Sequence, residues 1–234
     1  MKLLVSPINR EEAIIASRGG ADIVDVKNPK EGSLGANFPW IIREIKEAVD
    51  GRQPISATIG DFNYKPGTAS LAAFGAAVAG ADYIKVGLYD IQTEAQALEL
   101  LTKITRAVKD YDSTKKVVAS GYSDYKRINS IPPLLLPSIA AEAGADVVMV
   151  DTAIKDGKST FEFMDENELK KFTDLAHEYG LENAIAGSLK FEDLPVLERI
   201  GPDIIGVRGM VCGGDRRTAI RQELVEKLVA ECQA

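Results

Sequence analysis

A fourfold repeat constrains this chain more than any other feature of its sequence. Each copy has a glycine, then an alanine or proline, an aspartate and a run of β-branched residues, and the copies begin 60, 64 and 57 residues apart. The glycine is typical of a helix end and the aspartate of a turn, so each run predicts a strand. The copies are Gly20–Lys27, Gly80–Gly87, Gly144–Asp151 and Gly201–Arg208.

Further strand and helix patterns lie between the copies. The remaining strand candidates are 2–6, 54–59, 116–121 and 183–188. Apolar stripes with helical spacing run through 40–49, 68–79, 93–110, 165–180 and 215–230. Strand–helix alternation at about 30 residues per unit predicts parallel strands with crossover helices, and hence one (β/α)8 barrel in the single domain 1–234. An open doubly wound sheet is the alternative, but no G-x-G-x-x-G motif follows the first strand.

Alternation along the repeated strands separates their side chains into two sets. Four and six residues after each repeat glycine, every residue is a β-branched aliphatic one, and we expect these to face the helices. Five and seven residues after it, we expect the side chains to point into the barrel near the carboxyl ends of the strands, where barrel active sites lie. The charged members of this second set are Asp25, Lys27, Lys85, Asp151 and Arg208.

Charges inside a barrel are costly unless they are paired. One structural ion pair, such as Asp25 with Lys85, accounts for two of these charges but not for the rest. A lysine shielded from water and close to another cation has a lowered pKa, and its neutral amine can attack a carbonyl to form a Schiff base. A second lysine or an aspartate can then move protons. The cluster predicts aldol, retro-aldol or isomerisation chemistry that needs no metal.

Four loops of the predicted barrel are candidates for binding substrate. Loops after the seventh and eighth strands bind phosphate in many barrels. The candidate residues there are Ser188, Arg208, Gly209 and the amides of Gly213 and Gly214, assisted by Arg216. Segment 28–39 is long for a strand–helix connection and predicts a cover over the substrate. Lys155 can reach the mouth from the loop after the sixth strand. Ordinary turns and a solvated lysine are the alternatives.

Composition excludes several classes of function. The formal net charge of −7 and the pI near 5.0 argue against nucleic-acid and membrane-surface partners, and leave a small-molecule substrate. Two cysteines without metal spacing, and an N-terminal apolar run too short for a signal peptide, predict a cytoplasmic protein. The single histidine, His177, is expected to be structural at a helix end. The sequence leaves the oligomeric state open, and a homo-oligomer is compatible with it.

The segment 25–40, DVKNPKEGSLGANFPW, closely resembles (5-formylfuran-3-yl)methyl phosphate synthase, a family of methanofuran biosynthesis. Further matches are YKPGT at 64–68, GADYIKVGLY at 80–89, DTAIKDGK at 151–158 and GVRG at 206–209. The resemblance covers essentially the whole chain. It implies a (β/α)8 barrel without cofactors that converts two molecules of D-glyceraldehyde 3-phosphate into a furan phosphate, with loss of phosphate and water.

The resemblance also implies roles for individual residues. The lysine that matches Lys27 forms the Schiff base, and the lysine that matches Lys85 accepts a proton. By analogy, Asp25 and Asp151 orient or titrate these lysines, and Lys155 holds a phosphate or relays a proton. Two alternatives remain: an aldolase-like lyase that makes a simple sugar phosphate, and a phospho-ligand-binding barrel without catalytic activity.

Overall fold

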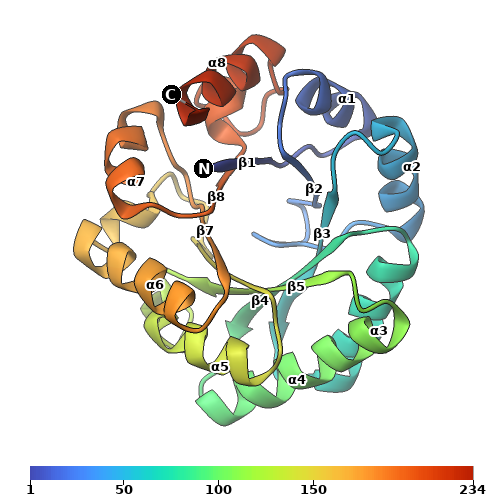
Figure 1. Cartoon of the computed structure of the whole chain (residues 1–234), viewed down its shortest axis with the longest axis vertical. Helices are drawn as coiled ribbons and strands as arrows, with labels where there is room; N and C mark the ends of the chain where they lie inside the picture. The colour runs from blue at the N-terminus through green and yellow to red at the C-terminus, as the bar shows by residue number, and fades with distance from the viewer. Residues whose placement is uncertain (234) are drawn as a thin grey trace.

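The strands of the protein form one closed, parallel barrel. In the computed structural model, which describes residues 1–233, each strand pairs with the next along the chain, and β8 pairs with β1. Figure 1 shows the strands enclosed by a ring of helices, which confirms the predicted (β/α)8 architecture. The strands are β1 (Lys2–Val5), β2 (Ile23–Val26), β3 (Ile55–Asn63), β4 (Tyr83–Asp90), β5 (Lys116–Tyr122), β6 (Val147–Asp151), β7 (Glu182–Ile185) and β8 (Ile204–Val207).

The helices are α1 (Arg10–Arg18), α2 (Pro39–Val49), α3 (Pro66–Val78), α4 (Glu94–Tyr111), α5 (Leu136–Glu142), α6 (Glu166–Glu178), α7 (Leu194–Ile200) and α8 (Gln222–Gln233). Five helices match the predicted stripes, although the last of them begins later than predicted, and three short helices, α1, α5 and α7, had no predicted stripe. The last helix begins at Gln222 and not near 215. Gly213 and Gly214 have φ of 76° and 98°, outside the right-handed helical region, so they separate a short 3-10 helix at Gly209–Cys212 from α8.

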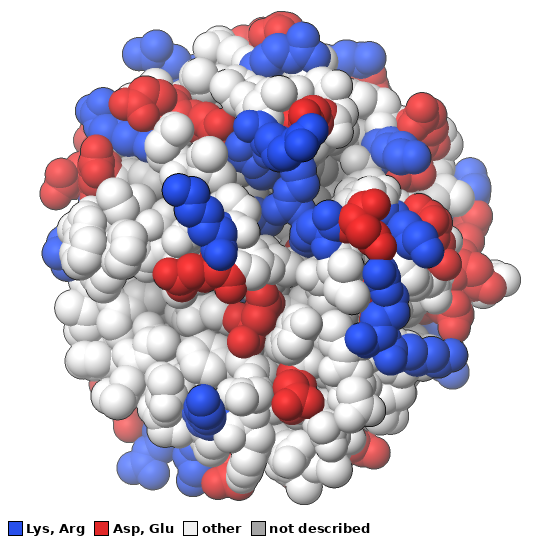
Figure 2. Space-filling model, turned by 180° about the vertical axis from the view of Figure 1, so that it is seen from behind, with Lys and Arg blue, Asp and Glu red and all other residues white. Residues whose placement is uncertain are grey.

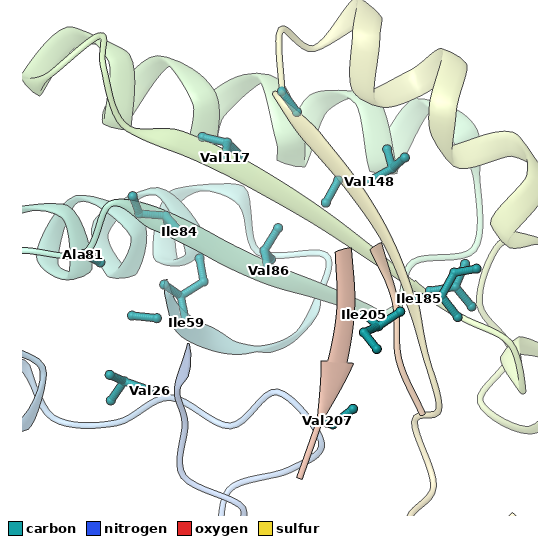
Figure 3. Close-up of a cluster of buried hydrophobic side chains, with 14 of the residues drawn as sticks. Val26, Ile59, Ala81, Ile84, Val86, Val117, Val148, Ile185, Ile205 and Val207 are labelled. Atoms are coloured by element: carbon teal, nitrogen blue, oxygen red, sulfur yellow. The ribbon is translucent and has the colours of Figure 1, made fainter. Parts of the chain in front are cut away.

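The apolar core has an outer and an inner part, as alternation along the strands predicts. All eight β-branched residues of the first set belong to the cluster between the strands and the helices, part of which is drawn in Figure 3. A separate cluster fills the inside of the barrel below the charged residues. Its members are Leu4, Ile23, Val118, Val147, Met149, Ala184, Ala186 and Ile204.

The aspartate of each repeat joins two neighbouring strands at the amino end of the barrel. Its carboxylate accepts the backbone N–H of a residue near the start of the preceding odd-numbered strand, at 2.7 or 2.8 Å. The four pairs are Asp22 with Leu3, Asp82 with Ile55, Asp146 with Val117, and Asp203 with Asn183. His177 Nε2 lies 2.9 Å from Asp203 Oδ2, so the single histidine supports this structural contact, as expected from the sequence.

Candidate active site

A buried ion pair lies at the bottom of the candidate site. Asp25 on β2 and Lys85 on β4 both point into the barrel, and Lys85 Nζ lies 2.9 Å from Asp25 Oδ2. The Asp25 carboxylate also accepts the hydroxyls of Ser6, at 2.9 Å, and Ser56, at 2.7 Å. Burial alone raises the pKa of Asp25, but the cations of Lys85 and Lys27 outweigh it and lower this pKa below its usual value. Asp25 is therefore a carboxylate held on three sides.

Lys27 lies at the carboxyl end of β2, two residues beyond Asp25, and its amine is unpaired. The residue is 6% exposed, and its Nζ has no hydrogen-bond or ion-pair partner within residues 1–233. Burial lowers the pKa of Lys27 to about 7, and the nearby cations of Lys85 and Lys155 act in the same direction, against Asp151 and Asp25. A large share of this amine is therefore neutral, and nucleophilic, near neutral pH.

Asp151 and Lys155 form a second ion pair at the carboxyl end of β6. Lys155 Nζ donates to Asp151 Oδ1 and, at 2.9 Å, to Thr152 Oγ1. Burial raises the pKa of Asp151, but Lys155 and Lys27 lower it to about 2 overall. The pKa of Lys155 is lowered by burial. The structure thus brings Lys155 to the mouth of the barrel, whereas the sequence left open whether it is a solvated loop residue.

A cavity of about 1240 Å³ opens above these groups at the carboxyl ends of the strands. Every predicted site residue lines it except Asp25, which is fully buried next to Lys85. Figure 2 shows Lys and Arg side chains gathered beside a hollow on the face turned away in Figure 1. The protein is acidic overall, but this cavity has many basic residues. They are Lys27, Lys85, Lys155, Lys190, Arg208, Arg216, Arg217 and Arg221.

Arg208 contacts protein groups with its whole guanidinium. Its Nη1 and Nη2 donate to Glu12, at 2.7 and 3.3 Å, and its remaining N–H groups donate to backbone carbonyls of Ser6, Arg216 and Thr218. All five donors are engaged, so binding phosphate would require breaking one of these bonds. This geometry favours a role in which Arg208 shapes the phosphate loop, in contrast to the direct contact expected from the sequence.

The glycine turn after β8 also differs from its expected geometry. The amides of Gly213 and Gly214 both donate to Gly209 O, and Gly214 does so at 2.9 Å. They are therefore occupied, and the geometry does not favour the predicted cradle of these two amides. Arg216 is the better phosphate candidate, because it lines the cavity and its side chain has no hydrogen bond within the described chain. Burial lowers the pKa of Arg216, which is half-buried.

Segment 28–37 lies over the mouth of the barrel. In Figure 1 the light-blue segment that follows β2 crosses the centre of the ring. Ser33 Oγ donates to Thr152 O at 2.8 Å, and Thr58 Oγ1 donates to Gly35 O at 2.6 Å, so the segment is tied to β3 and to the end of β6. Leu34 is fully buried. The segment that was predicted to cover the substrate thus lies across the mouth of the barrel and is hydrogen-bonded to it.

Sequence reasoning missed two polar residues under this cover, Asp61 and Tyr122. Tyr122 Oη donates to Asp61 Oδ1, and Leu34 N donates to Asp61 Oδ2 at 3.1 Å. Alternation along β5 places Tyr122 inside the barrel with Val118 and could have found it. Asp61 follows an irregularity in the β3–β4 register between Thr58 and Asp61, so simple alternation could not assign its side.

Two other kinds of chemistry find no support in the described part of the chain. Within residues 1–233, no group of three or more His, Cys, Asp and Glu side chains is arranged to hold a metal ion. Cys212 is buried beside the cavity, and burial raises the pKa of its thiol. A raised thiol pKa is the opposite of what an activated cysteine nucleophile shows.

Among the same residues, no helix is long and apolar enough to cross a membrane.

The fold and the cavity define a TIM-barrel protein with buried lysines at the carboxyl ends of its strands. The chain belongs to the 4-HFC-P synthase family, whose family model matches residues 3–229. It is 92% identical, over the whole of both chains, to the (5-formylfuran-3-yl)methyl phosphate synthase of Methanosarcina acetivorans. It is 60% identical to that of Archaeoglobus fulgidus, over 98% of each chain. These two matches confirm the resemblance seen in the sequence.

Solved structures show similarity in fold alone. The N-(5'-phosphoribosyl)anthranilate isomerase of Pyrococcus furiosus superposes with a TM-score of 0.65 at 17% identity, and covers 100% of this chain and 98% of its own.

Proposed function

We propose that this protein is a lyase that makes 4-(hydroxymethyl)-2-furancarboxaldehyde phosphate from two molecules of D-glyceraldehyde 3-phosphate in methanofuran biosynthesis. One phosphate and two molecules of water leave in the balanced reaction. Relatives at 92% and 60% identity are named (5-formylfuran-3-yl)methyl phosphate synthase. The observation that carries the proposal is the unpaired, buried Lys27 amine, with its pKa lowered to about 7, among two ion pairs.

Lys27 begins the covalent chemistry in this proposal. Its neutral Nζ forms a bond to the carbonyl carbon of one triose phosphate, and the carbonyl oxygen takes one proton from this nitrogen and one from Lys85 and leaves as water. The resulting iminium withdraws electrons, so the carbon next to it loses a proton more readily and a nucleophilic enamine forms. One triose phosphate is isomerised to its ketose within the site, and aldol coupling joins the two trioses. Elimination of phosphate, ring closure and loss of water then make the aromatic furan.

Lys85 is well placed to move protons between these steps. Its ammonium, held by Asp25 at 2.9 Å, can donate a proton to the leaving oxygen, and the neutral amine that remains can accept a proton from carbon. Asp25 keeps its negative charge throughout, because Ser6 and Ser56 also donate to it. On the other side of Lys27, Asp151 and Lys155 form a second pair that can stabilise the iminium and relay protons.

The phosphate groups bind on the side of the cavity formed by the loops after β7 and β8. We assign direct contacts to Ser188, Gly209 and Arg216, which line this side. A Cβ on Gly209 would lie 3.8 Å from Arg216 Cβ, so these two positions are neighbours. Arg208 acts through the loop, because its donors already hold Glu12 and three backbone carbonyls. Gly213 and Gly214 form the turn that places Arg216.

Borohydride trapping tests the proposal. The protein is incubated with D-glyceraldehyde 3-phosphate, reduced with borohydride and digested, and the peptide masses are measured. We expect a triose-phosphate adduct on Lys27 that is absent from Lys27→Ala, together with a furan absorbance in the unreduced reaction. Lys30 is the matched control, because it is exposed three residues along the same segment, and Lys30→Ala should keep both signals.

Other outcomes point to other functions. An adduct on Lys27 with a sugar phosphate as product, and no furan, would indicate an aldolase-like lyase. Furan formation without an adduct would mean acid–base catalysis without a covalent intermediate. Binding of the triose phosphate without adduct or turnover, unchanged in Lys27→Ala, would indicate a binding protein and overturn the proposal.

A further inference from the structure

Asp61, which is half-buried, and Tyr122, which is buried, form a polar pair that the proposed chemistry does not use. Tyr122 is fully buried, and its hydroxyl donates to one carboxylate oxygen of Asp61. The other oxygen accepts the backbone N–H of Leu34 at 3.1 Å. Burial raises the pKa of Asp61 and, together with Asp61, that of Tyr122. Removing a carboxylate from water is costly unless hydrogen bonds compensate for it. The two hydrogen bonds of Asp61 therefore suggest that it holds Leu34 and Tyr122 in place.

The Asp61–Tyr122 pair occupies space that a side chain at Gly32 or Gly87 would fill. A Cβ on Gly32 would overlap Asp61 Oδ2, and Gly32 has a φ of 139°, which side chains other than glycine rarely adopt. A Cβ on Gly87 would overlap Tyr122 Oη and lie 2.6 Å from Asp61 Oδ1. The backbones of segment 28–37 and of β4 therefore approach the pair closely, as in a fitted contact between the cover and the barrel.

What the pair holds is the cover beside Lys27. Leu34 packs with Tyr122 in a small buried cluster under the cover. The neighbouring residues Gly32 and Ser33 line the same cavity as Lys27. Asn37 Nδ2 donates to Lys27 O at 3.4 Å, so the end of the cover returns to the strand that carries the amine. An open cover would admit water to Lys27 from this side.

We infer that Asp61 is a positioning residue for Lys27: with Tyr122 it fastens segment 28–37 over the mouth of the barrel and so closes the cavity wall beside the Lys27 amine. Substrate then enters on the opposite side, between the loops after β6, β7 and β8, where the cavity opens among Lys155, Lys190 and Arg216. The inference rests on the proposed role of Lys27, but its test does not depend on the substrate.

The test measures the ionisation of Lys27 by competitive labelling with acetic anhydride. The modified fraction of the Lys27 peptide is followed against pH by mass spectrometry in the full-length protein. In the native protein the midpoint should lie near 7. In Asp61→Ala an open cover hydrates the amine, and the midpoint should rise by about 1 pH unit or more. Asp25, Lys85, Asp151 and Lys155 face Lys27 and are the same in both proteins.

Three further variants separate positioning from a general loss of structure. Tyr122→Phe keeps the packing and removes one hydrogen bond, so a smaller rise is expected. Asp61→Asn keeps an oxygen that can accept from Leu34 N–H and should restore most of the native midpoint. Asp203→Ala is the matched control: its carboxylate also accepts a backbone N–H and contacts a side chain, but at the amino end of the barrel. Asp203→Ala should lower stability and leave the midpoint unchanged.

Failure of the inference is distinct from failure of the proposed function. An unchanged midpoint in both Asp61→Ala and Tyr122→Phe would overturn the inference, whatever the substrate is. An equal rise in Asp203→Ala would also overturn it, because loosening of the whole barrel would then explain the effect. A native protein that gives neither furan nor a borohydride adduct on Lys27 would overturn the proposed function and leave the labelling result standing. Turnover in Asp61→Ala should fall about 10- to 100-fold if Lys27 is displaced.

Discussion

Lys85 Nζ lies 2.9 Å from Asp25 Oδ2, and both side chains are at most 1% exposed. The sequence raised this pair as a purely structural explanation for two of the inward charges, and the structure contains it. The pair leaves Lys27 without a carboxylate partner of its own, which is what a nucleophilic amine requires. The structural pair and the candidate nucleophile are therefore parts of one arrangement.

Breaking this ion pair from one side should be far more costly than removing both partners. We expect Asp25→Ala to lower the free energy of unfolding by about 3 to 5 kcal/mol, because Lys85 is left as an uncompensated buried charge. The double variant Asp25→Ala, Lys85→Met should recover a large part of this loss. Urea unfolding of the two single variants and the double variant measures the coupling. Additive losses would contradict the expectation.

Lys27 should be unfavourable for stability and essential for activity. In Lys27→Met we expect the free energy of unfolding below pH 7 to rise by about 1 to 4 kcal/mol, because no charge has to be buried. The folded-state pKa is lowered to about 7 from 10.5, so the unfolded chain binds the proton more tightly. The gain of the variant should then be full below pH 7 and disappear as the pH rises toward 10.5. Urea unfolding at pH 6 and pH 10 measures it; an equal gain at both values would refute the assignment.

The barrel could be predicted well from the sequence, because the repeat shows where the strands lie and which side chains point inward or outward. The eight β-branched residues and the inward charges occupy the sides that alternation assigns. Helices α1, α5 and α7 have nine, seven and seven residues, too few for an apolar stripe to identify them. The start of α8 was misplaced because the apolar positions say little about where the glycine turn ends.

The candidate site was predictable in its lysines but not in its hydrogen bonds. Alternation within each strand places Lys27 and Lys85 inside the barrel, because the alternation of side chains depends only on neighbouring residues. Spacing cannot show that Glu12 from α1 takes up the guanidinium of Arg208, a contact between residues 196 positions apart. The same holds for Asp61, which reaches Leu34 only because β3 extends beyond its register irregularity.

Arg216 and Arg208 should respond in opposite ways to loss of charge. Arg216→Met should raise the KM for the phosphorylated substrate about 10-fold or more and change stability little, because its guanidinium contacts no protein acceptor in the described chain. Arg208→Met should lower the free energy of unfolding by about 3 to 5 kcal/mol, because Glu12 is left buried and unpaired. Steady-state kinetics and urea unfolding of both variants separate the roles. A large KM change with native stability in Arg208→Met would instead restore its direct contact with phosphate.

Asp151 should contribute to the free energy of unfolding only at pH values at which its carboxylate is ionised. Burial raises its pKa, but Lys155 and Lys27 lower it to about 2 in the folded protein, below the ordinary 3.8. A lowered carboxylate pKa adds stability that is present above 3.8 and is lost as the pH falls through 2. We expect Asp151→Asn to lower the free energy of unfolding by about 2 kcal/mol at pH 7. The difference from the native protein should shrink between pH 4 and pH 2, where native Asp151 takes up its proton.

Asp110→Asn is the control for this pH dependence. Asp110 and its i,i+4 partner Arg106 are both exposed, so the free energy of unfolding of this variant should not change with pH in the same way. A constant difference across this range would mean that Asp151 acts through packing and not through its charge.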